Sequence, residues 1–213
     1  MMPVYLRQLH DVSANPPFGR VGLAVRRWRN VRGFGVHSPA AFALMREVVR
    51  PDRKYGLYSY YPLDCLLERA SISSSELYPL RSLMRMLLRL SCHLSPAFIR
   101  ISLPSAGGGI SSLAPIFTCL PALAGVPEQS RNASGSGLWI FGSRVSEGEI
   151  PEIESALQEG CALVLIGEAG SECSRFYSRM PGGVRIMMPG LSLLLPIPGS
   201  ACSTYHARLH PSR

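Results

Sequence analysis

The sequence lacks the features that mark membrane-spanning, exported and zinc-binding proteins. Its longest apolar run, residues 191–197, is interrupted by a serine and a proline and is far shorter than the roughly 20 residues of a membrane span. The first 20 residues contain no apolar stretch typical of a secretory signal. We therefore expect a cytoplasmic protein without a transmembrane segment, in which the thiols are reduced and mostly buried. The six cysteines form no CxxC pair, and Cys161 and Cys173 have no matching pair of histidines, so no zinc site is expected.

Lysine and acidic residues are also scarce. Lys54 is the only lysine among 22 basic side chains, and 14 acidic side chains leave a net charge of +8. Such a protein is expected to bind polyanions weakly through the release of counterions. In contrast, hydrophobic residues make up 46% of the 213 residues, which favours a packed core over disorder. Twenty glycines and 18 prolines indicate short elements joined by many turns.

Residues 1–95 are predicted to form a basic, helical appendage. Residues 21–32 have apolar residues on one face and arginines around the rest. This pattern fits a docked helix with a solvated basic face, or a helix that binds a membrane surface or a nucleic acid. Ser38 and Pro39 suit the N-cap and first position of a second helix, which Pro51 ends. His37 lies beside this cap and is either a local hydrogen-bonding group or a catalytic base.

A tyrosine-rich segment and a long helix complete the appendage. The tyrosines of residues 55–61 either stack on a base or pack the appendage onto the main domain. Residues 76–90 predict a helix whose inward side chains are Leu80, Leu83, Met84, Leu87 and Leu88. Three arginines recur every four residues along its outer edge, at Arg81, Arg85 and Arg89. Such a row is typical of a solvated face, and the alternative is a site for an acidic partner.

From residue 96 the pattern becomes that of alternating strands and helices. Phe98–Ser112 runs from an apolar strand through a glycine turn into the start of a helix, which Pro115 is expected to end or bend early. Glycines let a ligand approach the backbone, and a helix N-terminus presents free N–H groups to it. The candidate cofactor-binding residues are therefore Ser105, Ala106, Gly107, Gly108 and Gly109. The alternative is a tight strand-to-helix connection without a ligand, because a lone AGGG is weakly specific.

The remaining segments predict an α/β domain over residues 96–213. Residues 138–141 and 161–166 are apolar strands of a parallel sheet, residues 150–158 and 171–180 are helices, and residues 120–137 form a loop. Residues 184–187, 191–195 and 204–209 predict three closing strands, of which the last two are expected to pair antiparallel. This order predicts a Rossmann-like sheet between two helical layers.

Six segments together resemble a known family. They are VHSPAAFALMREVV with the tyrosines after it, RISLPSAGGGISSL, LWIFGS, ALVLIGE, Phe176-Tyr177 and VRIMMPGLSLLLPIPGSACSTYHARL. In order and spacing they resemble the class I SAM-dependent (O-)methyltransferase-like family of Bacteroidetes, over most of residues 33–209. The resemblance implies a methyltransferase-like fold. It also implies that SAM, if any cofactor, binds at the glycine turn.

The sequence departs from that family where the family binds its cofactor. Ser102 stands near the usual acidic residue at the end of the first strand, and Pro104 replaces the first glycine and removes its N–H. The second and third strands are shortened or absent. Their segment has one carboxylate, Glu128, in place of the acid that holds the ribose. The adenosine side of the pocket thus has no evident wall.

The metal ligands that the family often uses are missing too. At the ends of the fourth and fifth strands, the aspartates are replaced by Gly142-Ser143 and Gly167-Glu168. Glu168 alone does not make a multidentate Mg²⁺ site, so no metal is expected. The serines beside the glycine turn lie in no GxSxG motif, and hydrolysis is not expected.

Three functions follow as hypotheses. The first is a degenerate methyltransferase-fold protein without catalysis, which acts as a structural or partner-binding module, either with another protein or as a homo-oligomer. The second is an active SAM-dependent methyltransferase with an atypical pocket, where Glu128 or Glu168 supplies the missing acid and the glycine turn holds the methionine end. The third is a nucleic-acid or anionic-surface binder that uses the arginines of residues 20–32 with those of residues 81–89.

Overall fold

The computed structural model describes residues 38–49, 60–70, 74–103, 114–126, 136–142, 145–167 and 170–207. Several predicted features lie outside these residues. They are the helix at 21–32, His37, most of the tyrosine-rich segment, and the glycine turn with its five candidate residues. The fold is a mixed α/β structure, as predicted, with a six-stranded sheet.

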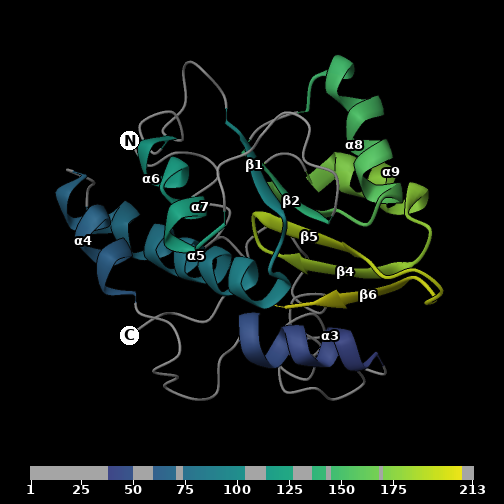
Figure 1. The fold of residues 1–213 in the computed structure, drawn as a ribbon, viewed down its shortest axis with the longest axis horizontal. Coiled ribbons are helices and arrows are strands. Elements are labelled where there is room, and N and C mark those ends of the chain that lie inside the picture. Colours follow the sequence, from purple (N-terminus) through teal and green to yellow (C-terminus); the bar gives the residue numbers. More distant parts are fainter. Residues whose placement is uncertain are drawn as a thin grey trace, which may run out of the picture.

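The strands are arranged in the order β1-β2-β3-β5-β4-β6 (Figure 1). Their bounds are β1 (Phe98–Ser102), β2 (Gly137–Phe141), β3 (Ala162–Ile166), β4 (Gly183–Met188), β5 (Leu191–Pro196) and β6 (Ser203–His206). β1, β2 and β3 are mutually parallel, and β5 lies antiparallel between β3 and β4. β6 runs parallel to β4. Five strands therefore share one direction, and β5 alone opposes them.

The predicted antiparallel pairing of the last two strands is wrong. β5 instead forms a hairpin with β4, through a turn in which Gly190 has a φ of 68°. The other edge of β5 is taken by β3, with Val164 opposite Leu193. Both edges of β5 are thus filled, so β6 pairs with the remaining edge of β4, where Ile186 is opposite Tyr205.

Helices cover both faces of the sheet. They are α3 (Pro39–Leu44), the π-helix η1 (Met45–Val49), α4 (Tyr61–Arg69), α5 (Ser74–Leu94), α6 (Ala114–Thr118), α7 (Leu120–Leu123), the 3-10 helix η3 (Glu147–Glu149), α8 (Ile150–Gln158) and α9 (Gly170–Arg179). Side chains of α3 to α7 share a core with the first face of the sheet, which carries Ile99, Ile140 and Val164. α8 and α9 share a core with the second face, which carries Phe98 and Trp139. Three layers result (Figure 1).

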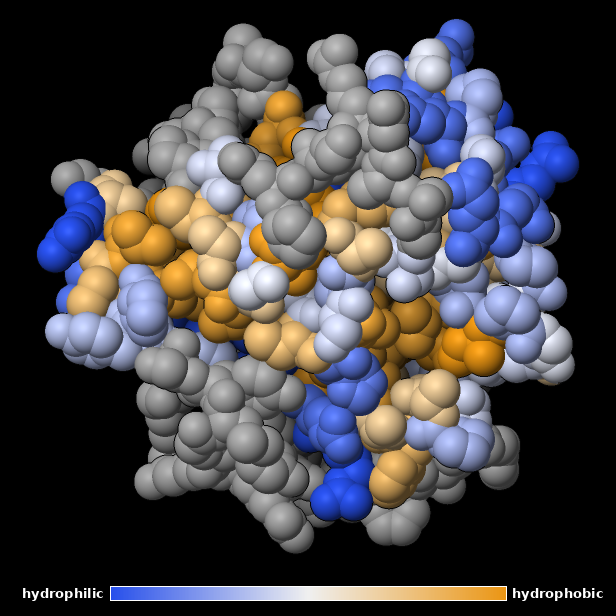
Figure 2. Space-filling model, in the orientation of Figure 1, coloured by the Kyte–Doolittle hydropathy of each residue, from blue (hydrophilic) through white to orange (hydrophobic). Residues whose placement is uncertain are grey.

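The predicted appendage and the predicted α/β domain share one core. Leu44 of α3, Leu63 of α4 and Leu87 of α5 belong to the same cluster as the first face of the sheet. The outer surface of α8 and α9 is mostly hydrophilic, whereas apolar residues show over α5 (Figure 2). Within the described ranges, no helix combines the length and the hydropathy that crossing a bilayer requires. The boundary between residues 95 and 96 stays a prediction.

Local sequence signals are confirmed at several helix ends. The Ser38 side chain accepts a hydrogen bond from the Ala41 N–H (3.4 Å), and Pro39 follows as predicted. Pro151 lies in the first turn of α8, and Gly160 follows this helix with a φ of 90°. All five predicted inward side chains of α5 are buried.

One prediction about a proline is wrong. Residues 120–123, expected in a loop, form α7 with Pro121 in its first turn. The first N–H groups of a helix have no partner within the helix, so a proline there loses nothing and starts the helix. Pro115 lies in α6, and the residues before α6 in which its helix was expected to begin lie outside the described ranges.

Candidate functional site

The carboxyl ends of the parallel strands β1, β2 and β3 lie side by side. In open α/β sheets, ligands bind just beyond these carboxyl ends. The predicted cofactor-binding residues Ser105 to Gly109 lie outside the described residues, as do Glu128 and Glu168. The described part of the site is therefore its rim, formed by the ends of the three strands and by η3.

At this rim, a carboxylate that the sequence analysis missed meets the end of β1. Glu149 Oε1 accepts a hydrogen bond from the Ser102 hydroxyl (3.2 Å). Its Oε2 accepts from the N–H (3.0 Å) and the hydroxyl (2.7 Å) of Ser146. An acid thus stands beside Ser102, but it comes from η3 instead of β1. The sequence does contain a pattern that marks Glu149, namely the capping box Ser-x-x-Glu of residues 146–149.

These contacts favour the ionised form of Glu149. The Ser146 hydroxyl is the largest cause of the lowered pKa of Glu149, and burial opposes it. The Ser146 N–H, the Ser102 hydroxyl and the charge of Arg100 lower the pKa further. All the donors belong to the chain itself. The carboxylate therefore ties the start of α8 to the end of β1.

Arg100 and Trp139 lie side by side on the second face of the sheet. They are register partners in β1 and β2, and the Arg100 guanidinium lies 4.4 Å from the centre of the Trp139 ring. Arg100 also forms an ion pair with Glu152 of α8. Trp139 is only 6% exposed, and its buried Nε1–H has no hydrogen-bond partner among the residues that the structure describes. Neither residue was predicted from the sequence as part of a site.

Gly142 and Gly167 stand where the family that this sequence resembles often has metal-binding aspartates, and here they follow the ends of β2 and β3. The Gly142 N–H donates to Ser102 O (2.9 Å), and the Gly167 N–H donates to Gly190 O (2.8 Å). Gly167 has a φ of 82°, a conformation that favours glycine. Among the residues that the structure describes, no three His, Cys, Asp or Glu side chains are grouped so as to hold a metal ion.

The cysteines are less buried than the sequence predicted. Cys161 and Cys173 are buried, Cys65, Cys92 and Cys119 are partly buried, and Cys202 is exposed, so the expectation of mostly buried thiols holds fully for two of the six. Burial is the main cause of the raised pKa of Cys92, Cys161 and Cys173. Thiols of raised pKa are weak nucleophiles near neutral pH because the thiolate is the reactive form.

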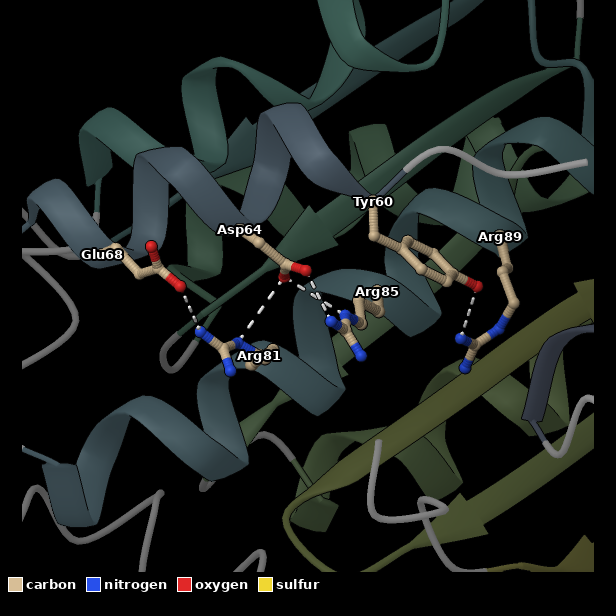
Figure 3. Close-up of polar contacts among 6 residues, drawn as sticks. All are labelled: Tyr60, Asp64, Glu68, Arg81, Arg85 and Arg89. Atoms are coloured by element: carbon tan, nitrogen blue, oxygen red, sulfur yellow. Dashed lines mark hydrogen bonds and ion pairs between the residues drawn. The ribbon is translucent and has the colours of Figure 1, made fainter. Parts of the chain in front are cut away.

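The arginine row of α5 binds the protein's own acidic residues (Figure 3). Arg85 donates two hydrogen bonds to Asp64 of α4, at 3.2 and 2.5 Å. Arg81 pairs with Asp64 (3.5 Å) and with Glu68 (3.2 Å). The expectation of a solvated basic face is therefore wrong for these residues. Their acidic partner is the neighbouring helix.

Arg89, the third arginine of the row, is buried at 3% exposure. Its Nε–H donates to Val48 O (2.7 Å), and its Nη1 donates to the Tyr60 hydroxyl (3.0 Å; Figure 3). Val48 lies in the last turn of η1, where carbonyls lack partners within the helix and favour a cation. The Tyr60 ring also lies 4.9 Å from the Arg85 guanidinium, so Tyr60 packs α4 against α5. The row is thus an internal clamp that holds α4 and η1.

Comparison with known proteins adds no relative. A scan of protein-family models, a search of curated proteins and a search of solved structures each found no significant match to this chain. The structure by itself establishes a mixed α/β fold with the rim described above. Function is therefore argued from the arrangement of the chain's own elements.

Proposed function

We propose that this chain is a degenerate methyltransferase-fold protein without methyl-transfer activity, which acts as a structural or partner-binding module. One observation carries the proposal: among the described strands, β1, which leads into the glycine turn, lies at the edge of the sheet. In a doubly wound sheet of order 3-2-1-4-5-6, the equivalent strand lies at the centre, and the ligand binds beside it where the strand order reverses. The order β1-β2-β3 corresponds to strands 1-4-5 of such a sheet, without strands 2 and 3.

The helices between the strands support this interpretation. The connections from β1 to β2 and from β2 to β3 each step to the next parallel strand in the same direction. However, α6 and α7 of the first connection pack on the first face, whereas α8 of the second packs on the second face. The two connections, as their described helices place them, therefore have opposite hands. Right-handed connections of this kind are the strong rule.

A loss of two strands explains the exception. In a complete doubly wound sheet, strands 2 and 3 lie on one side of strand 1, and strand 4 lies on the other side. The helix that follows strand 1 leads to strand 2, and it lies on the opposite face of the sheet from the helices that follow strand 4. α6 and α7 lie on that opposite face. They are placed for a right-handed connection to a strand on the outer side of β1. We infer that such strands were present in an ancestor of this chain.

The same loss argues against catalysis. In the resembling family, the second strand ends in the acid that holds the ribose. Within the described part of the chain no strand lies beyond β1, so no strand end presents such an acid. The acid that does reach the rim, Glu149, is engaged by Ser102 and Ser146. No cofactor is therefore proposed for this protein.

One observation favours a second candidate, an active enzyme with an atypical pocket. Glu149 brings a carboxylate to Ser102, which stands near the place of the family's first acid. In that case the glycine turn would hold the methionine end of SAM. The third hypothesis loses the support of Arg81, Arg85 and Arg89, which are engaged within the chain, whereas its arginines at residues 20–32 lie outside the described residues. A cytoplasmic location stays a prediction.

Mass spectrometry of the protein as purified separates the two candidates. The protein is isolated without added ligand, denatured, and its extract is analysed for SAM and S-adenosylhomocysteine. The proposal predicts neither compound above the level of a control protein purified in the same way. Either compound at a substantial fraction of the protein concentration would support the enzyme instead.

A further inference from the structure

The second face of the sheet is only partly covered by helices in the described part of the chain. The core beneath α8 and α9 takes side chains from β1, β2, β3 and β5, and none from β4 or β6. Arg185 of β4 lies on this face, where its register partners are Leu194 of β5 and Thr204 of β6. It is partly buried. Its place is therefore the margin between the helical layer and the strands that this layer leaves uncovered.

One edge of the Arg185 guanidinium is only half filled. The Nε–H and Nη2–H groups of an arginine form an edge that matches two oxygens of an anion. In Arg85, this edge donates to both carboxylate oxygens of Asp64. In Arg185, Nη2 donates to the Ser174 hydroxyl (3.3 Å), and the buried Nε–H has no partner among the described residues. The edge that holds an anion in Arg85 is thus without one in Arg185.

No described acidic side chain forms an ion pair with Arg185. Its guanidinium lies 5.3 Å from the centre of the Tyr177 ring. Glu154 of α8, which reaches α9, is shared by Arg175 and Arg179. A partly buried charge has lost part of its hydration, and an opposite charge is what compensates this loss in proteins. An oxyanion at the Nε–Nη2 edge would supply both the charge and the acceptor for the Nε–H.

We propose that this edge of Arg185 binds a phosphate group. A carboxylate would use both of its oxygens on the guanidinium edge. A phosphate has further oxygens, which accept hydrogen bonds from hydroxyl groups beside the arginine. Ser174 already lies within hydrogen-bond distance of Nη2, and Thr204 is the register partner of Arg185 on the same face. The inference goes beyond the proposed function and does not depend on it.

The Ser174 side chain controls access to this edge. Ser174 is exposed on α9, and exposed side chains change rotamer within picoseconds to nanoseconds. Its hydroxyl can therefore turn from Nη2 towards a phosphate oxygen. A single phosphate group fits better than the backbone of a nucleic acid, which is bound by several cations along its length. The neighbouring Arg175 and Arg179 are already paired with Glu154.

An NMR titration of the full chain with sodium phosphate tests the site. Arginine Nε–H groups give their own signals, and the signal that disappears in Arg185→Lys is that of Arg185. At about pH 6.5 and constant ionic strength, this signal should shift to saturation with a dissociation constant of about 1–10 mM. The Nε–H signal of Arg85, whose edge Asp64 fills, should not move. Sodium acetate should bind at least about tenfold more weakly. No saturable shift up to about 50 mM phosphate, or an equal response to acetate, overturns the proposal.

Two variants separate the guanidinium edge from general positive charge. Arg185→Lys keeps the charge without the two-donor edge, so it should weaken phosphate binding at least about tenfold. Arg175→Lys, an exposed position on α9, is the matched control and should bind as wild type does. The backbone amides of Ser174 and Thr204 report binding in both variants, and circular dichroism checks their folding. Unchanged affinity in Arg185→Lys would show that the edge is not the site.

Glu172 of α9 is the competing occupant, because its side chain lies outside the described residues. Glu172→Gln should leave the Arg185 Nε–H signal of the ligand-free protein in place. A large shift of that signal in the variant would mean that the chain's own carboxylate fills the edge, and the proposal would be wrong.

Two probes then distinguish the source of the phosphate group. A short peptide with one phosphoserine is compared with inorganic phosphate through the Arg185 signal. Binding of the peptide at least about tenfold more tightly would identify a phosphorylated protein, and equal affinity would identify a small phosphate compound. Equal binding of the same peptide with unmodified serine would overturn the phosphate site. None of these results touches the proposed loss of methyl transfer, because SAM contains no phosphate.

Discussion

The two sides of the sheet differ in how the chain joins their strands and in where a ligand site is expected. Within the described residues, β1 is the edge strand on one side and β6 is the edge strand on the other. On the β6 side, β4 and β5 are joined by a tight turn, and each has a neighbour on both edges. The β1 side is also where a doubly wound sheet would bind its ligand. The proposed function implies that the half of the fold needed for packing has been kept and that the half needed for the cofactor has been lost.

The proposed function implies that the core and the ligand site of such a fold are separable. Within the described residues, the first core cluster has side chains from all six strands, and the second has side chains from β1, β2, β3 and β5. The edge of β1 is secured by local ties, namely the Glu149 carboxylate on Ser102 and the Arg100 ion pair with Glu152. We therefore expect stability and cofactor binding to depend on different residues. Substitutions on the two sides of the sheet can test this.

The largest expected effect comes from adding a methyl group to β4, a strand that has a neighbour on both edges. Gly183, at the start of β4, has a φ of 137°, and an added Cβ would lie 2.2 Å from the backbone oxygen of Leu195. Backbone in a paired strand has little freedom to move, so Gly183→Ala should lower the free energy of unfolding by about 3 kcal/mol or more.

Gly137→Ala on the β1 side is the matched substitution. Here the added Cβ would lie 2.3 Å from the end of the Phe98 ring, a buried side chain that can move more readily than the backbone. We expect a smaller loss, of about 1–2 kcal/mol, which Phe98→Leu should partly relieve. Urea denaturation measures all three variants. A larger loss for Gly137→Ala than for Gly183→Ala would contradict the difference between the two sides.

The next effect concerns the arginine clamp on the first face. Arg89→Met removes a buried guanidinium and leaves Val48 O and the Tyr60 hydroxyl without this donor. The expected loss is about 2–4 kcal/mol, because the buried Val48 O would lose a charged donor. Arg81→Ala is the control. Its pairs with Asp64 and Glu68 are partly exposed, so its loss should stay below about 1 kcal/mol. Similar losses for both variants would contradict the assignment of Arg89 as the buried member of the row.

The smallest effect is that of Glu149→Gln at the end of β1. The pKa of Glu149 is lowered in the folded state, so its carboxylate stabilises the fold at pH values above its unfolded pKa, about 4.3. That stability is lost as the pH falls through the lower, folded pKa. The variant should be less stable than wild type by about 1 kcal/mol or less near pH 7, since the carboxylate is partly exposed.

Denaturation curves at several pH values test this prediction. Below the folded pKa of Glu149 the wild-type carboxyl is protonated, so the two proteins should become equally stable. Ser146→Ala, which removes the main donor to the carboxylate, should reduce the pH dependence in the same way. A difference that persists unchanged to about pH 3 would show that the carboxylate charge is not the cause.

Much of the fold could be predicted from the sequence, because its signals are local. Continuous apolar runs predicted β1, β2 and β3, and Ser38, Pro151 and Gly160 marked helix ends. Pairing between distant segments was not predictable in the same way. β6 pairs with β4 because both edges of β5 are already filled, and no local pattern contains that information.

The candidate site was less predictable. The arginine row of α5 was visible, but its partners lie in α4 and η1, which only the tertiary structure brings close. Glu149 was readable as a capping residue, but its contact with Ser102 joins residues 47 positions apart. The glycine turn, the predicted cofactor site, stays a prediction from residues 105–109.

Calorimetric titration of S-adenosylhomocysteine and SAM into the full chain tests the central claim most directly. A Gly108→Arg variant, which fills the predicted glycine turn with a long side chain, serves as the control. If the cofactor half of the fold has been lost, neither compound should produce heat of binding at high protein concentration, for wild type or variant. Micromolar binding by wild type that Gly108→Arg abolishes would contradict the account and support an active methyltransferase.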